Sequence, residues 1–166
     1  MTQSPAAEVA HGFQPPILTQ FSVFLPNRCG MMLDLVGVFQ DQSLTLAGFS
    51  VVDSNDHSVV RLVTSRGELA RRLLSRNNMS FSETEVLAVE LDAAHTLGDV
   101  CRSLLAAEVN IHYAYPLLVR PRGRPGVVVQ SDDITLSGQI LRRKLFTLLA
   151  ENDLGDNASH AAPDSP

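Results

Sequence analysis

The chain has 166 residues, 45% of them hydrophobic, with a net charge of -5 and a pI near 5.4. This acidic balance argues against a general nucleic-acid binder, because such proteins are usually basic. No stretch reaches the roughly 20 apolar residues that span a bilayer, and residues 1–16 lack the basic start and apolar centre of a secretory signal. Two cysteines, Cys29 and Cys101, are too few for a disulfide framework. We therefore expect a cytoplasmic protein with reduced thiols, away from membranes and nucleic acids.

The first half of the chain alternates strand-like and helix-like patterns. Alternating apolar residues at 21–25 indicate a strand, and apolar residues recur at i, i+3, i+4 and i+7 from Met32 to Phe39, which indicates an amphipathic helix. Similar patterns predict the elements that follow. The expected order is strand 21–25, helix 32–39, strand 44–53, strand 57–64, helix 68–76 and strand 81–86.

The same outline returns in the second half with a constant offset of 65 residues. Asn27 falls on Asp92, and Gly30 falls on His95. The second copy starts without a linker, because the segment 82–91 carries both the last strand of the first copy and the first strand of the second. The other expected elements are helix 96–107, strand 109–119, strand 126–130, helix 134–144 and a short strand 146–149.

Each copy therefore has the order strand–helix–strand–strand–helix–strand (βαββαβ). Such units form a ferredoxin-like α+β fold, an antiparallel sheet with two helices on one face. We expect unit one at residues 17–84 and unit two at 85–154, with disordered tails at 1–16 and 155–166. Sheet edges left open in one unit are expected to be covered by continuing the sheet, within the chain or with a second chain.

The loop at residues 27–32 is the best candidate for a binding site. It leads from a strand into the start of a helix, where backbone N–H groups lack intrahelical partners and the helix dipole attracts anions. Gly30 lets a ligand carboxylate approach the backbone closely. Asn27 can both donate and accept hydrogen bonds, which suits the ammonium and carboxylate of an amino acid. An ordinary turn with the same residues remains the alternative.

The first copy resembles an ACT domain, a small regulatory module found on many enzymes of amino-acid metabolism. The resemblance is carried by residues 20–25, by Asn27-Arg28-Cys29-Gly30 with Met32, and by Leu44-Thr45-Leu46. Residues 17–154 as a whole resemble the stand-alone tandem ACT proteins of bacteria. Cys29 stands where the family commonly has Pro, and residues 92–95 of the second copy have lost both Pro and Gly. We therefore expect any effector site to be centred on the first copy.

The resemblance implies a non-enzymatic regulator that binds an amino-acid effector at an interface between two ACT units, as a homodimer and without a cofactor. The residues that it implies for ligand binding are Asn27, Arg28, Cys29, Gly30, Met31, Met32, Thr45 and Leu46. The alternative is an interaction subunit without a ligand of its own, which docks on an enzyme of amino-acid biosynthesis.

Other constellations indicate structure rather than chemistry. The histidines and cysteines lack metal-ligand spacing, so no metal site is expected. Arg120, Arg122 and Arg124 decorate a hairpin that we interpret as a solvated turn rather than a phosphate site. The chain has no Gly-x-Ser-x-Gly motif and no phosphate loop, so we assign no catalytic residue, although this fold class also includes enzymes.

Overall fold

The computed structural model describes residues 15–54 and 56–155, and it confirms the predicted order of helices and strands in both halves. Most of the two expected tails, and one residue of the expected turn at 54–56, lie outside the described residues. In chain order the elements are β1 (Leu18–Pro26), α1 (Met31–Phe39), β2 (Leu46–Asp53), β3 (His57–Thr64), α2 (Gly67–Arg76), β4 (Ser80–Glu90), α3 (Leu97–Leu105), β5 (Ile111–Pro116), η1 (Pro121–Gly123), β6 (Gly126–Ser131), α4 (Ile134–Arg143), β7 (Leu148–Leu149) and η2 (Glu151–Asp153).

The described strands form one antiparallel seven-stranded sheet in the order β2-β3-β1-β4-β6-β5, with β7 paired to β4. Strand β4 belongs to both units. Its residues 80–86 pair with β1 of unit one, and its residues 87–90 pair with β6 of unit two. Unit one therefore has the order β2-β3-β1-β4 and unit two the order β5-β6-β4-β7, which is the same topology twice. The shared strand predicted from the missing linker is confirmed.

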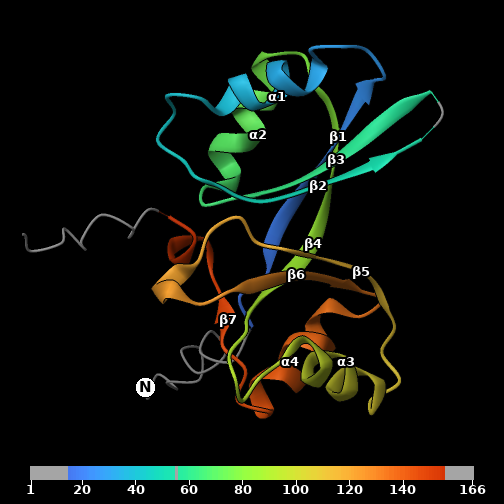
Figure 1. Cartoon of the computed structure of the whole chain (residues 1–166), viewed down its shortest axis with the longest axis vertical. Coiled ribbons are helices and arrows are strands. Elements are labelled where there is room, and N and C mark those ends of the chain that lie inside the picture. Colours follow the sequence, from blue (N-terminus) through green and yellow to red (C-terminus); the bar gives the residue numbers. More distant parts are fainter. Residues whose placement is uncertain (1–14, 55, 156–166) are drawn as a thin grey trace, which may run out of the picture.

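The helices lie at the two ends of the long axis, and the strands lie between them (Figure 1). Alternation along β4 explains this arrangement. Phe81 packs in the core beneath α1 and α2, whereas Leu87 and Val89 pack in the core beneath α3 and α4. Val86 and Ala88 point to the opposite face and join a third cluster. The faces without helices are thus turned toward each other in the middle of the molecule.

The third cluster is a central core shared by the two units. Leu18 of β1 and Ala47 of β2 pack there with Tyr115 of β5. Gly48 marks the closest approach, since a Cβ on it would lie 3.3 Å from the Tyr115 ring. The backbone N–H of Leu118 donates to the carbonyl of Ala47 at 2.8 Å. This contact with unit one explains why β5 is shorter than the strand expected at 109–119.

Unit two, expected at residues 85–154, also packs against a residue from the start of the chain. Pro15 is buried, and a Cβ on Gly138 of α4 would lie 2.5 Å from the Pro15 ring. The first described residue therefore packs on unit two, although the chain enters unit one three residues later. Residues of both units thus form the central core.

Candidate functional site

The predicted loop between β1 and α1 is exposed and open. Asn27 and Cys29 are exposed, and Gly30 adopts a left-handed conformation with φ of 90° as the N-cap of α1. No side chain in the described part of the chain caps this helix start. A Cβ on Gly30 would meet nothing within 4 Å. The glycine is therefore required by the backbone angle. The Met31 amide donates to the Arg28 carbonyl at 3.4 Å, and no described side chain accepts from the amides that follow it.

The remaining residues of the predicted site divide into two groups. Met31 and Met32 are half-buried against the core of unit one, next to the loop. Thr45 and Leu46 lie at the far end of the same sheet, because Pro26 pairs with His57 at one end of β3 and Leu46 pairs with Thr64 at the other. A single chain does not bring Thr45 and Leu46 to the loop.

Thr45 instead lines a cavity between the two units. This space, which we call the junction cavity, has a volume of about 360 Å³. Unit one supplies residues 42–45 and 65–66, and unit two supplies residues 151, 152 and 155. The carboxylate of Glu151 reaches across the junction and accepts a hydrogen bond from the backbone N–H of Gly67 at 3.0 Å, which caps α2.

The junction cavity was not predicted from the sequence. Its lining comes from segments about a hundred residues apart, and they meet only because the faces without helices pack together. Thr45 was singled out through the family resemblance alone. The only local signal is the hydroxyl-rich, charged composition of Ser43, Ser65 and Arg66 near the ends of β2 and β3.

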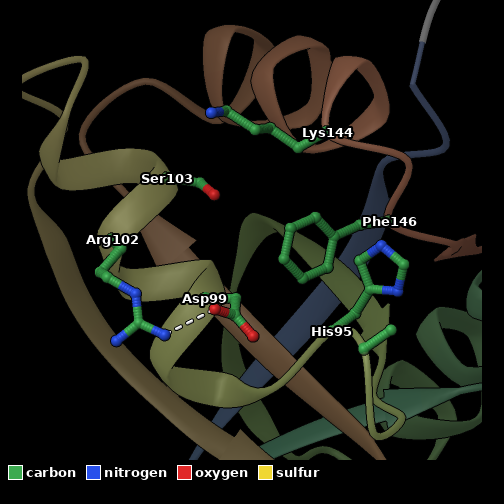
Figure 2. Close-up of a pocket in the computed structure, with 7 residues that line it drawn as sticks. His95, Asp99, Arg102, Ser103, Lys144 and Phe146 are labelled. Carbon is green, nitrogen blue, oxygen red and sulfur yellow. Dashed lines mark hydrogen bonds and ion pairs between the residues drawn. The ribbon is translucent and has the colours of Figure 1, made fainter.

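A second cavity, of about 330 Å³, lies in unit two between α3 and the end of α4. Figure 2 shows the rings of His95 and Phe146 side by side at its edge, with Ser103 on α3 and Lys144 at the end of α4. The two rings are 4.9 Å apart in an edge-on arrangement. His95 corresponds to Gly30 by the 65-residue offset, although the N-cap of α3 is Thr96, one residue later. This cavity therefore adjoins the counterpart of the predicted loop.

Side chains close the loop in unit two, unlike the loop in unit one. The Asp92 carboxylate accepts hydrogen bonds from the amides of Ala94 and His95, each at 2.8 Å. Thr96 and Asp99 form a reciprocal capping box at the start of α3. Burial favours the neutral form of Asp92, yet these amides and the His95 imidazole outweigh it and lower its pKa. Hydrogen bonds from Thr96 and then Arg102 lower the pKa of Asp99.

A polar bridge crosses the central core beside the junction. The hydroxyl of Tyr115 donates to the Gln20 side-chain oxygen at 2.7 Å, and the Gln20 amide donates to the Tyr113 hydroxyl at 2.8 Å. Burial raises the pKa of Tyr115. Arg61 stacks on the Tyr113 ring at 3.6 Å from its centre. Because every one of these contacts joins β1 or β3 to β5, the bridge fixes unit one against unit two.

The arginines of the hairpin at 120–124 have structural partners. Arg122 and Arg124 donate to the buried carboxylate of Glu90, at 2.8 and 3.1 Å. This pairing raises the pKa of Arg122. A buried carboxylate needs such partners, because an unpaired charge in the interior is costly. The turn is exposed, as expected, and two of its three arginines also tie the hairpin to β4 through Glu90.

Within residues 15–54 and 56–155, no three His, Cys, Asp or Glu side chains gather in a way that could hold a metal ion. In that part of the chain no helix is long and apolar enough to cross a membrane. Cys29 and Cys101 are both exposed and free.

Comparison with known proteins agrees with this architecture of two βαββαβ units joined through one strand. The ACT domain pair profile matches residues 17–157. The chain therefore belongs to the family of ACT domain pairs. No curated protein matches the sequence.

Two solved structures share the fold. Protein BT0572 from Bacteroides thetaiotaomicron is similar with a TM-score of 0.74 and 23% identity, over 84% of this chain and 96% of that chain. The ligand-free regulatory subunit of aspartate kinase from Thermus thermophilus is similar with a TM-score of 0.51 and 7% identity, over 79% of this chain and 94% of that chain. At these identities the two structures show a common fold and no more.

Proposed function

We propose that this ACT domain pair is a non-enzymatic regulatory protein that binds a small ligand, with an amino acid as the candidate, and works in the cytoplasm as a homodimer. The observation that carries the proposal is the open start of α1 beside Gly30, on a fold shared with a regulatory subunit of aspartate kinase. The helix dipole and the amides that follow Met31 favour a carboxylate there. Asn27 is exposed in the same loop, and its side-chain oxygen can accept from the ammonium group.

The remaining loop residues fit the same proposal. The side chains of Arg28 and Cys29 are exposed around the helix start, and Met31 and Met32 offer an adaptable apolar surface for a ligand side chain. Thr45 and Leu46 belong to such a site only if a second chain brings its β2 to the loop, as binding between units of a homodimer requires. Ligand binding then shifts an equilibrium between two arrangements of the dimer.

A panel of the common L-amino acids, tested on the full chain by thermal unfolding and calorimetry, checks the proposal. At a hundredfold excess over Kd the ligand stabilises the fold by about 2.7 kcal/mol, which raises Tm by several degrees. Asn27→Ala should weaken binding about tenfold, whereas Gln40→Ala at the other end of α1 should leave it unchanged. A folded chain that no amino acid stabilises would overturn the proposal.

The exposed face of α1 favours a second candidate function. Leu33 is 75% exposed and Val36 is 40% exposed, on a helix whose only charged residue is Asp34. A helix with apolar residues on all sides is usually buried. This surface suits docking on another protein, such as an enzyme of amino-acid biosynthesis. Purification of the tagged chain from its native extract should recover a stoichiometric enzyme that Leu33→Gln releases, and recovery of the chain alone would count against this function.

A further inference from the structure

The junction cavity is open to solvent, and side chains of both charges line it with hydrogen-bonding groups that no described residue uses. Arg66 uses only Nη1, which donates to the Ser43 hydroxyl at 2.8 Å and to the Ser43 carbonyl at 3.1 Å. Its Nε and Nη2 form no hydrogen bond within the described residues. Glu151 uses Oε1 to accept from Gly67, which leaves Oε2 for another partner. Arg66 and Glu151 both line the space, yet they form no ion pair with each other.

Uncharged polar groups complete the lining. The hydroxyl of Thr45 and the side-chain amide of Asn152 make no hydrogen bond within the described part of the chain, and both line the cavity. Leu44 is half-buried and supplies an apolar patch. The binding capacity of the space does not come from the start of α2, because Glu151 already occupies its first amide. It comes from side chains that have hydrogen-bonding groups to spare.

We propose that the junction cavity is a second ligand site, separate from the loop at Gly30, and that it binds a free α-amino acid as a zwitterion between the two units. The ligand carboxylate pairs with Nε and Nη2 of Arg66, which present the planar fork that carboxylates prefer, and accepts from Thr45. The ammonium group donates to Oε2 of Glu151 and to the Asn152 carbonyl. The volume of about 360 Å³ is at the small end of ligand sites, which suits a metabolite of amino-acid size.

A ligand in this site would contact both units directly. The carboxylate end is held by unit one through Thr45 and Arg66, and the ammonium end is held by unit two through Glu151. A neutral metabolite pairs with neither charged wall, and a purely anionic one pairs with Arg66 but is repelled by Glu151. The inference rests on the proposed function as an amino-acid-binding protein, and it adds where within one chain the amino acid binds.

The test uses the full chain, because Gly155 lines the cavity and the sequence continues beyond it. Asn27→Ala first weakens binding at the loop beside Gly30, so that binding at the junction cavity can be measured in its presence. Calorimetry with the panel of L-amino acids should then show residual binding of one ligand per chain. In that background Glu151→Gln should lower the affinity tenfold or more, and Arg66→Gln should do the same. Arg72→Gln, on the outer surface of α2, should change the affinity less than twofold.

Glu151→Gln also separates a binding role from a structural one. Glutamine keeps an oxygen that accepts from Gly67 N–H, so Tm without ligand should stay within a few degrees while binding falls. If binding is complete in Asn27→Ala and absent in Arg66→Gln, the cavity is the main site. If Asn27→Ala abolishes all binding, or the residual binding ignores both cavity variants, the inference fails while the proposed function stands. If the wild type binds no amino acid, both fail.

Discussion

The starts of α1 and α3 occupy equivalent places in the two units, yet their backbone amides are satisfied in different ways. In unit two, Asp92 and the capping box of Thr96 and Asp99 accept hydrogen bonds from the loop and helix amides. In unit one, Gly30 turns the chain with a positive φ, and no described side chain caps the helix. The two units therefore have the same scaffold but different helix starts. We call the start of α3 sealed, because side chains accept from its amides, and the start of α1 open, because no described side chain does.

The comparison shows that a helix start can either stabilise the fold or remain available for a ligand. A sealed helix start contributes to folding and offers little to an anion, because its donors are already used. An open start sacrifices that contribution and keeps its donors for a ligand. The junction cavity follows the same logic at a third helix, α2, where Glu151 from the other unit supplies the cap. Three variants can break or sharpen the comparison.

The largest effect is expected for Gly30→Ala, which should destabilise the fold by about 1–2 kcal/mol because an L-residue is strained in the left-handed conformation. Space is not the cause, since a Cβ would meet nothing within 4 Å. Gly37→Ala is the matched control on the same helix. It also has open space, and it should stabilise the fold by about 0.5–1 kcal/mol. Urea unfolding measures the free energy of unfolding of both variants. A Gly30→Ala chain as stable as wild type would contradict the need for a left-handed conformation at residue 30.

The next effect is expected for Thr96→Ala, which should cost about 1 kcal/mol because α3 loses its N-cap. Ser82→Ala, at an exposed position of β4, serves as the control for loss of a hydroxyl. The same urea unfolding experiment applies. If Thr96→Ala left the free energy of unfolding unchanged, the Thr96 cap would not stabilise α3. The contrast between the two helix starts would then fail.

Much of the fold was accessible from the sequence because its signals are local and repeated. The 65-residue offset predicted two units of one topology, and the absent linker predicted that β4 serves both. The packing of the faces without helices was not accessible. It depends on contacts such as Leu118 with Ala47, between strands that no local pattern relates. For the same reason β5 ends at Pro116, where periodicity alone continued the strand.

The candidate site shows the same division. Gly30 was recognised from its place before an amphipathic helix, and its positive φ agrees with that role. The grouping of Thr45 with Asn27 came from the family resemblance, which joins residues of two units. In one chain β1 and β2 run parallel on either side of β3, so the end of one strand and the start of the other lie at opposite ends. Asp92 went unrecognised because a carboxylate that accepts loop amides leaves no periodic pattern. Asp99 was overlooked, although Thr96 and Asp99 have the Ser/Thr-x-x-Asp/Glu spacing of a capping box.

The smallest effect is expected in the pH dependence of folding stability that Asp99 causes at the start of α3. The folded-state pKa of Asp99 is lowered, chiefly by the Thr96 hydroxyl. A lowered pKa contributes stability that is complete above the unfolded-state pKa of about 3.9 and is lost as pH falls through the folded-state value. Asp99→Asn should therefore be less stable than wild type at pH 6. The difference between their free energies of unfolding, which we call the gap, should narrow as pH falls below about 4. Thr96→Ala should weaken the same pH dependence, because Asp99 then lacks its main donor. Urea midpoints from pH 6 to pH 3 measure the gap, and a gap that stays constant would show that Asp99 does not depend on the capping box for its charged form.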